Sequence, residues 1–569
     1  MPKHWNIRER TEKNIIDQLL LNRKIDSKDP QAVEQFLHPK YEQAFNPFLF
    51  KEMRKATERI WKAIEAKEKF YIYSDYDADA VTAATVVYRG LKFLGIESEV
   101  YIPDRFTEGY GLNLEAFQKI KDSGATVVIT VDCGTNSTEE AEFCKTNSID
   151  LIITDHHEIT GEIPDAFALI NPKRPGEEYP YHELTGVGVA YKLIAALYRD
   201  PRCTLASGFE KWLLDLVAIG TVADCHSLLG ENRILVSYGI QVLKKTKWLG
   251  LRALLQLANI STEDITAKTL GFTLAPRINA AGRLEHASGA FNLLIADEPL
   301  QASAAAAALD AVNKKRQLLT ETVMSEARAQ IELVRDRNVL MVHGADWPKG
   351  VVGLVAGKLA EEYSKPVFVM ERGEEFSTGS ARSIPEFNVV DALIYSKDIL
   401  IKYGGHAAAA GFTVRTENLE KFYESLLRFA DTVMPSAEVI VNSEITEPTV
   451  KTLQAEAELY SEELNMQTAE AIDAMEPFGK DNERPRLVLR NAILESINTV
   501  GKEQQHAQLT LTIGGRKIKG IAFSIAKAFS HFNCGEPVDA LFETLIDTWQ
   551  GMRTLKIRVI DMRPSQGLK

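Results

Sequence analysis

The hydrophobic pattern of the first half of the chain alternates between short apolar runs and longer segments with helical spacing. The runs are rich in aromatic and β-branched residues and cover residues 70–73 (FYIY), 99–102 (EVYI), 126–131 (TVVITV) and 150–154 (DLIIT). Runs of this length predict buried strands. Residues 53–66 and 81–94 lie between them and have helical spacing. Strands that alternate with helices predict an α/β domain over residues 46–255.

Acidic and imidazole side chains follow three of these predicted strands. They are Asp75, Asp77 and Asp79 after the first, Asp132 after another, and Asp155, His156 and His157 after the last. Ligands of an open parallel sheet collect outside the carboxyl ends of its strands, so these residues are expected to line one crevice. Carboxylates this close repel one another, and a cation such as Mg2+ or Mn2+ relieves the repulsion. The alternative for residues 75–79 is a solvated acidic turn.

Two further segments adjoin this set. Residues 213–223 (LLDLVAIGTVA) end on Asp224, and their pattern is compatible with a helix or a strand. Residues 185–195 (TGVGVAYKLIA) open a helix, and close helix packing explains their glycines better than a phosphate site does.

The pair His156 and His157 follows Asp155 at a strand end. A histidine pair in this position is more often a ligand or catalytic group than a core residue.

The rest of the chain changes character twice. Residues 300–334 lack Gly and Pro and predict a long helix that spaces two lobes. A second α/β unit is predicted over residues 336–435, with strands at 338–342 and 366–370. Beyond it, residues 509–513 and 517–521 alternate between polar and apolar side chains around Gly514 and Gly515, which predicts hairpins of a small barrel or sandwich.

Several segments carry groups that suit phosphate. Arg277, Asn279 and Arg283 lie in a small-residue segment that is predicted as a loop, and Ser380 and Arg382 in a predicted Gly/Ser-rich turn. His406 follows two glycines at the predicted start of a small-residue helix, and helix N-termini bind anions. Arg105 lies in a loop at residues 103–111. The alternative for these charged residues is ordinary solvated surface. Residues 314–316 (KKR) of the predicted long helix face either a substrate channel or solvent.

Composition narrows the class of protein. The 569 residues predict two to four domains, and the five cysteines are scattered without a CxxC pair, which argues against a disulfide framework or a zinc site. No apolar run approaches the length of a membrane span, and the N-terminal residues lack a signal-peptide core, so a cytoplasmic protein is expected. The net charge of −13 argues mildly against nucleic-acid binding through bulk positive charge, but it is compatible with a local basic channel.

Taken together, these motifs resemble the DHH phosphoesterase superfamily. The resemblance rests on residues 75–79 (DYDAD), Asp132, residues 155–157 (DHH) and Asp224, and residues 404–411 (GGHAAAAG) are similar to the companion DHHA1 domain. Five segments are similar to the RecJ family of this superfamily: residues 103–111 (PDRFTEGYG), 230–233 (GENR), 275–283 (APRINAAGR), 379–383 (GSARS) and 476–479 (EPFG). Two positions depart from the pattern. Tyr73 stands where the superfamily's pyrophosphatases have a histidine, and residues 225–227 (CHS) are more polar than the usual RecJ continuation.

The resemblance implies a fold and a domain order. The fold is a DHH parallel-sheet α/β domain that a long helix joins to a DHHA1 α/β domain, followed by a C-terminal β-barrel of the OB-fold type. The expected divisions are a lead segment at residues 1–45, the DHH catalytic domain at 46–255, a phosphate-contact loop and connecting helix at 256–335, the DHHA1 substrate-binding domain at 336–435, and the OB-fold nucleic-acid-binding domain at 436–569.

The resemblance also implies an activity. It is a single-stranded-DNA-specific 5′→3′ exonuclease that hydrolyses phosphodiester bonds by a two-metal mechanism and releases nucleoside 5′-monophosphates, in DNA recombination and repair. The cofactors are two divalent ions, with Mn2+ favoured over Mg2+ because a histidine joins the carboxylates. The implied partners are single-stranded DNA with a 5′ end, a single-strand-binding protein and a helicase. The protein is expected to be a monomer that makes no membrane contact.

Roles follow for individual residues. Asp132 would bridge the two ions, Asp79, His156 and Asp224 would hold one, and Asp77 with Asp75 the other. Asp155 would orient the imidazoles, and His157 would stabilise the transition state or protonate the leaving group. Arg105, Ser380 and Arg382 would bind the terminal 5′-phosphate, and Arg277, Asn279, Arg283 and His406 the next phosphates.

Two other functions are compatible with the motifs. One is a DHH-family phosphodiesterase acting on short oligonucleotides or cyclic dinucleotides, although such chains usually lack the C-terminal β-module and the segment 276–283 (PRINAAGR). The other is a non-catalytic single-strand-binding scaffold. Because the carboxylates and both histidines of the motif are all present, the sequence favours a working enzyme.

Overall fold

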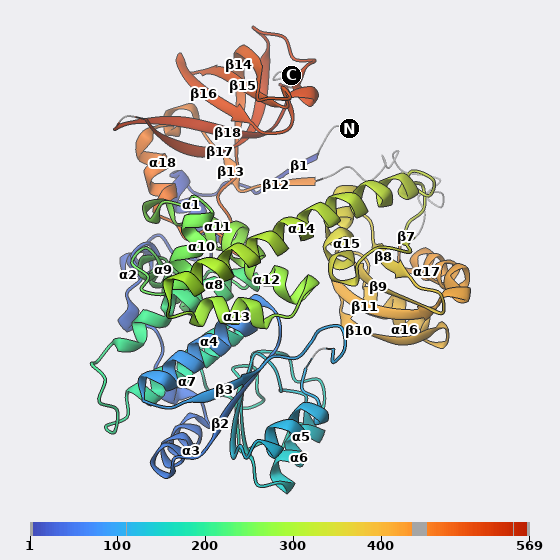
Figure 1. The fold of residues 1–569 in the computed structure, drawn as a ribbon. Coiled ribbons are helices and arrows are strands. Elements are labelled where there is room, and N and C mark those ends of the chain that lie inside the picture. The colour runs from blue at the N-terminus through green and yellow to red at the C-terminus, as the bar shows by residue number, and fades with distance from the viewer. Residues whose placement is uncertain (1–3, 110, 435–451, 550, 566–569) are drawn as a thin grey trace.

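The computed structural model describes residues 4–109, 111–434, 452–549 and 551–565. Tyr110 of the predicted phosphate loop and residues 435–451 at the predicted start of the OB domain lie outside these ranges. Figure 1 shows an α/β body, a second α/β lobe at the far end of the long helix α14, and a β-barrel that lies over the body's helices. The predicted fold class is confirmed. Among the described residues, no helix combines the length and the apolarity needed to cross a membrane.

A parallel sheet organises the first lobe. Its strand order is β3-β2-β4-β5-β6, with β2 at Phe70–Ser74, β3 at Ser98–Tyr101, β4 at Val127–Val131, β5 at Asp150–Thr154 and β6 at Ala168–Ile170. The register pairs Ser74 with Val131 and Val131 with Thr154. The residues that follow these three, Asp75, Asp132 and Asp155, therefore leave the sheet side by side. The sheet edge brings the acidic residues together as the sequence predicts.

Helices cover both faces of this sheet. They are α3 (Met53–Ala66), α4 (Ala78–Phe93), α5 (Leu114–Asp122), α6 (Thr138–Thr146) and α7 (Gly186–Tyr198). Alternate strand residues enter two different cores. Ile72, Ile129 and Ile152 pack with α3, α4 and α7, whereas Tyr73 and Val128 pack with α5 and α6. Because both faces of the sheet are buried, successive strand residues are all apolar, and the strands appear in the sequence as continuous apolar runs.

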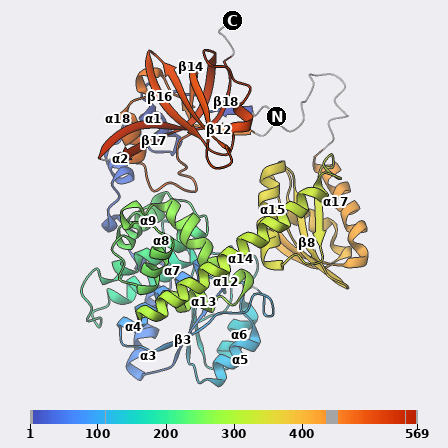
Figure 2. The same ribbon diagram turned by 45° about the horizontal axis from the view of Figure 1, so that its top comes forward.

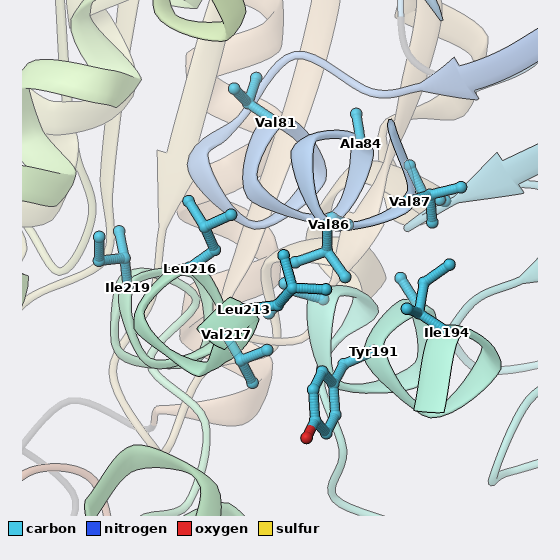
Figure 3. Packing of buried hydrophobic residues seen from close by; sticks show 14 of the residues in the cluster. Val81, Ala84, Val86, Val87, Tyr191, Ile194, Leu213, Leu216, Val217 and Ile219 are labelled. Carbon is cyan, nitrogen blue, oxygen red and sulfur yellow. The ribbon is translucent and has the colours of Figure 1, made fainter. Parts of the chain in front are cut away.

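The ambiguous segment 213–223 forms helix α8 (Leu214–Ala223) after a short 3-10 turn. Leu216 and Ile219 of α8 face Val81 and Val86 of α4, with α7 beside them (Figure 3). Helix α9 (Gly230–Leu243) covers another side of α8. A helix that is enclosed on all sides is apolar all round, which explains why its sequence carries no clear helical period.

Helix α14 (Pro299–Ile331) connects the two α/β lobes as the sequence predicts. It packs first on α10 (Leu249–Leu257), α12 (Ala275–Leu284) and α13 (Ser288–Ile295). Its far end packs on α15 (Lys349–Tyr363) of the second lobe, as Figures 1 and 2 show. The prediction of a loop at residues 276–283 is wrong, because this segment forms α12. Its small residues serve packing: a Cβ on Gly282 would lie 2.5 Å from the carbonyl oxygen of Tyr76.

The second α/β lobe holds a mixed sheet of order β10-β11-β9-β8-β7. Its elements are β7 (Leu340–Gly344), β8 (Val367–Arg372), β9 (Phe376–Arg382), β10 (Leu400–His406), β11 (Ala409–Arg415), α16 (Val389–Tyr395) and α17 (Leu419–Val433). Two local predictions are wrong. Residues 380–382 end strand β9 instead of forming a turn, and residues 404–411 form the β10–β11 hairpin instead of opening a helix. The helical preference of alanine gives way because Ala410, Phe412 and Val414 alternate into the core.

The C-terminal strands close into a barrel. They are β13 (Ala457–Glu458), β14 (Leu487–Val500), β15 (His506–Ile513), β16 (Arg516–Ala522), β17 (Pro537–Trp549) and β18 (Met552–Pro564). Neighbours pair in the order β14-β15-β16-β18-β17, and β17 pairs back onto β14. The predicted hairpin around Gly514 and Gly515 joins β15 to β16. Closure removes free sheet edges between these five strands.

The N-terminal lead packs on the barrel. Strand β1 (His4–Ile7) pairs with β12 (Thr452–Ala455), and α1 (Ile15–Asn22), α2 (Pro30–Leu37) and α18 (Met466–Asp473) contribute to the barrel's core. Arg233 of α9 ties this assembly to the first lobe. Its guanidinium donates to the carbonyl oxygens of Phe36 at 2.6 Å, Met475 at 2.9 Å and Glu476 at 2.7 Å.

Replacing Arg233 by alanine is expected to loosen the junction between the first lobe and the barrel. The variant leaves three carbonyl oxygens without their charged donor, and such bonds contribute about 1.5–3 kcal/mol each, so a loss of about 3 kcal/mol or more is expected. Calorimetry should resolve separate melting of the barrel and the first lobe. Arg516→Ala, at an exposed position, is the control. A melting profile like that of the wild type would contradict this role.

Candidate metal centre and anion site

Asp132 occupies the centre of the sheet edge. It is buried, its backbone N–H donates to the carbonyl oxygen of Thr154 at 2.9 Å, and its φ of 60° lies in the left-handed region. A non-glycine residue in this region costs energy and is often found at functional sites. The left-handed conformation turns the chain sharply after β4. Asp132 Oδ1 lies 3.0 Å from His156 Nε2.

Two more aspartates come from the start of α4. Asp77 caps this helix, because its Oδ1 accepts from the backbone N–H of Ala80 at 3.0 Å. Asp79 is the second residue of this helix and accepts from the backbone N–H groups of Gly186 at 2.7 Å and Val187 at 3.0 Å. These are the first N–H groups of α7, where the helix dipole favours a negative charge. The N-terminus of α7 thus holds the Asp79 carboxylate in place.

The DHH motif separates into two tasks. Asp155 accepts from the backbone N–H groups of Thr135, His156 and His157 and from the ring Nδ1 of His157 at 2.7 Å, so its oxygens are engaged. His156 points instead at other carboxylates, with Nε2 3.7 Å from Asp224 Oδ2, and its Nδ1 makes no hydrogen bond among the described residues. This arrangement supports an orienting role for Asp155 and a ligand role for His156.

The buried aspartates of the cluster repel one another, and a nearby positive charge would relieve this repulsion. Burial and the charge of Asp77 raise the pKa of Asp75 to about 8, and burial with neighbouring aspartates raises the pKa values of Asp77, Asp79 and Asp132. Burial and the charge of His157 lower the pKa of His156 to about 3, so this imidazole is neutral and able to donate a lone pair.

The residues present therefore fit divalent metal ions. Buried oxygen atoms of Asp75 and Asp132 have no hydrogen-bond donor among the described residues. Hard carboxylate oxygens together with imidazole are the donor set of Mn2+ and related ions. Two groups of possible ligands lie within coordinating reach: Asp132, Asp155, His156 and His157 form one, and His156, Asp224 and His226 form the other.

Tyr73, which takes the position of a histidine in related pyrophosphatases, does not face this cluster. Its hydroxyl donates to the carbonyl oxygen of Gly111 at 3.1 Å, and its ring stacks on Tyr101 and Phe117 in the core beneath α5. Asp75 remains the candidate ligand at this end of the site. Its oxygen without a hydrogen-bond partner supports that role.

Two glycines let helices approach the carboxylates closely. A Cβ on Gly186 would lie 2.3 Å from Asp132 Oδ1, and one on Gly220 would lie 2.7 Å from Asp79 Oδ1. The glycines at the start of α7 therefore serve close packing, as the sequence suggests. What the sequence does not disclose is that the neighbour of Gly186 is the central carboxylate of the site.

Four arginines gather beside the metal cluster from four separate segments. They are Arg105 of the loop 103–111, Arg283 of α12, Arg316 of α14 and Arg382 of β9. Burial and the charges of the other three lower the pKa of Arg283 to about 10, and burial with the charge of Arg105 lowers the pKa of Arg382. Among the described residues, none of the four forms an ion pair with a carboxylate. Guanidiniums held together without carboxylate partners make these four residues a candidate anion site.

Ser380 belongs to this anion site, because its hydroxyl accepts from Arg382 Nη1 at 2.8 Å. The structure thus brings together Arg105, Arg283, Ser380 and Arg382 and adds Arg316, for which the sequence left a solvent-facing position open. Arg105 is close enough to Asp75 to lower its pKa, and Asp77 raises that of Arg283, so the anion site adjoins the metal cluster.

Three other predicted contacts are engaged elsewhere or exposed. Arg277 donates to Asp310 of α14 at 2.9 Å and to the carbonyl oxygen of Thr273 at 2.7 Å. Asn279 accepts from the backbone N–H of Ala78 at 2.8 Å and so braces the start of α4. His406 is exposed at the end of β10. Their contact with a substrate stays a prediction.

Comparison with known proteins agrees with this geometry. Family models match residues 69–221 as "DHH family, N-terminal domain", residues 336–432 as "DHHA1 domain" and residues 455–561 as "RecJ OB domain". The parallel sheet with its carboxylate and histidine cluster is thus that of a DHH-family protein, and the companion domains narrow the class further.

A curated relative shows the family. The single-stranded-DNA-specific exonuclease RecJ of Bacillus subtilis (strain 168) is 35% identical over 555 residues, which cover 97% of this chain and 68% of that protein. The chain belongs to the RecJ family of single-stranded-DNA-specific exonucleases.

Solved structures agree in fold. The crystal structure of RecJ from Thermus thermophilus in complex with Mn2+ matches with a TM-score of 0.80 and 24% identity, covering 100% of this chain and 80% of that one. A crystal structure of exonuclease RecJ bound to manganese matches with a TM-score of 0.60 and 31% identity, covering 67% and 94% of the two chains.

The close contact at Gly186 gives a test of the metal centre. Gly186→Ala should displace the Asp132 carboxylate and weaken Mn2+ binding by about tenfold or more, as measured by titration calorimetry on metal-free protein. Gly289→Ala on α13 is the matched control, because its new Cβ would meet only Leu309 at 3.9 Å. Equal Mn2+ affinity in the two variants would show that Asp132 takes no part in binding.

Proposed function

We propose that this chain is a metal-dependent, single-stranded-DNA-specific 5′→3′ exonuclease that releases nucleoside 5′-monophosphates in DNA recombination and repair. The observation that carries the proposal is the adjacency of the metal cluster and the arginine site. A terminal phosphate held by guanidiniums places the next phosphodiester over the carboxylates. Membership of the RecJ family supports the same substrate.

Within this proposal, the ligands divide between two ions. Asp132 lies between the other carboxylates and would bridge two ions, with Asp79, His156 and Asp224 on one and Asp77 with Asp75 on the other. When bound, two such ions activate a water molecule and neutralise the charge that develops on the phosphate. Mn2+ or Mg2+ suits the oxygen donors, and the imidazole favours Mn2+.

The protein's own residues complete the reaction. His157 Nδ1 donates to Asp155 Oδ1. The acid of the reaction would therefore be the other ring nitrogen, Nε2. Burial opposes protonation of this ring, but the hydrogen bond to Asp155 and its negative charge raise the pKa of His157 above its ordinary value. The Nε2 proton can then pass to the leaving O3′ atom as the P–O3′ bond breaks. The shortened strand keeps a 5′-phosphate and can bind again.

The arginine site sets polarity. Arg105, Ser380 and Arg382 would hold the terminal 5′-phosphate, with Arg283 and Arg316 next to it, while Arg277, Asn279 and His406 would contact following nucleotides. The barrel offers a further surface for the strand. Phe523 is 50% exposed there, with its ring 5.3 Å from His506 and the Arg558 guanidinium 6.0 Å away. An exposed ring beside a guanidinium suits base stacking and backbone contact.

The remaining expectations form part of the same proposal. The chain would divide at residues 46–255, 256–335, 336–435 and 436–569 after the lead at 1–45. It would act as a monomer in the cytoplasm, where its five free cysteines stay reduced. A single-strand-binding protein and a helicase would supply its substrate.

The activity is tested with a single strand labelled at either end. With Mn2+, the wild type should release the 5′ label as a mononucleotide from single strands and leave a blunt duplex intact. Asp132→Ala should lower the rate at least a thousandfold, and removal of metal with a chelator should abolish it, since bridging is lost in both cases. Turnover of dinucleotides alone would favour the small-substrate phosphodiesterase, and binding without cleavage would favour a scaffold.

The terminal phosphate pocket makes a separate prediction. Arg382→Ala should raise KM for a 5′-phosphorylated strand by about ten- to a hundredfold, because a hydrogen bond to a charged group contributes about 1.5–3 kcal/mol. A strand with a 5′-hydroxyl should respond much less. Arg415→Ala on β11, next to β9, is the control, because this exposed arginine pairs with Glu375. An equal rise in KM for the 5′-phosphorylated and the 5′-hydroxyl DNA would show that Arg382 does not bind the terminal phosphate.

A further inference from the structure

His226 follows the last carboxylate of the site by two residues, and the backbone turns it towards the metal cluster. Asp224 ends helix α8, and Cys225 adopts a left-handed conformation with a φ of 55°. The reversal places His226 Nε2 3.2 Å from Asp224 Oδ2. The ring centre of His226 lies 4.9 Å from that of His156. His226, from the polar segment at residues 225–227, therefore lies beside the metal cluster.

The other ring nitrogen determines the tautomer of His226. Its Nδ1 lies 3.2 Å from the carbonyl oxygen of Glu183. A carbonyl oxygen only accepts, so Nδ1 carries a hydrogen and donates it. In the neutral ring, Nε2 then carries no hydrogen, and its lone pair is directed at Asp224. A backbone carbonyl that fixes Nδ1–H in this way is the usual support of a histidine that binds metal through Nε2.

The contact between Nε2 and Asp224 needs a positive charge. Two lone-pair atoms at 3.2 Å repel each other unless a proton or a cation lies between or beside them. One solution is a second proton on the ring, which makes an ion pair with Asp224. The other is a metal ion shared by both groups. The position of His156 favours the metal ion, because its Nε2 lies 3.7 Å from the same Asp224 oxygen. A shared ion accounts for both imidazoles at this carboxylate, whereas a proton on His226 accounts for only one.

We propose that His226 is an additional ligand of the cation held by His156 and Asp224, and that it shifts the preference of this site from Mg2+ towards Mn2+ and later transition metals. The three candidate ligand atoms lie within 4.8 Å of one another, which is compatible with one shared ion. A second imidazole adds a nitrogen donor that transition metals bind more strongly than Mg2+ does. His226 thereby becomes a determinant of metal selectivity.

This inference rests on the metal site of the proposed function, so its test uses no DNA. Mn2+ and Mg2+ are each titrated into metal-free protein by calorimetry, for the wild type, His226→Ala and His226→Leu. We expect Mn2+ affinity to fall about tenfold in both variants and Mg2+ affinity to change less than about twofold. His531→Ala, at an exposed histidine of the barrel, is the matched control.

A spectroscopic measurement gives an independent readout. Electron spin-echo modulation of bound Mn2+ reports directly coordinated nitrogen, and the signal should weaken in His226→Ala relative to the wild type and the control. The melting temperature of the metal-free variants shows whether they fold. An unchanged Mn2+ to Mg2+ affinity ratio with unchanged nitrogen coupling in folded variants would overturn the inference and leave His226 as a charged partner of Asp224. A nuclease that fails on DNA but keeps this affinity difference would separate the two proposals.

Discussion

Repulsion between buried carboxylates is the constraint on which the first lobe depends. The in-register ends of β2, β4 and β5 place Asp75, Asp132 and Asp155 side by side, and the start of α4 adds Asp77 and Asp79. Within a buried site, these charges interact far more strongly than in water. The surrounding fold offsets part of the repulsion: the first N–H groups of α7 hold Asp79, and several donors satisfy Asp155. Divalent ions are left to offset the rest.

The need to hold these groups explains features of the fold that otherwise concern packing alone. Gly186 and Gly220 let α7 and α8 approach the carboxylates, and Asn279 of α12 braces the N-terminus of α4. Each of these contacts joins segments that are distant in sequence. A small change of backbone in α7, α8 or α12 would therefore move a ligand, because packed interiors transmit displacement instead of absorbing it.

The arginine site depends on a different part of the architecture. Two of its guanidiniums come from helices α12 and α14, one from a loop of the first lobe and one from the second lobe. Helix α14 fixes the distance between the lobes, and α15 packs on its far end (Figure 2). Like charges gather there without carboxylate partners among the described residues, which is costly unless an anion binds. This charge arrangement is the basis for the proposal that the metal cluster and the arginine site bind the two sides of one phosphodiester substrate.

By itself, the sequence determined the order of strands and helices in the first lobe, the long helix, the hairpins of the barrel and the candidate residues of the metal cluster. It could do so because strand ends of a parallel sheet share one edge, and because the apolar periods there are short and regular. It failed where small residues dominate. Residues 276–283 form a helix although they contain Pro and Gly, and residues 404–411 form a hairpin although they are rich in alanine, because packing against neighbouring elements overrides the local preference. Only the tertiary structure showed that Arg316 joins the anion site, that Arg277 pairs with Asp310, and that His226 turns towards His156. These are contacts between side chains of separate segments, and their distances follow from packing, which no local pattern encodes.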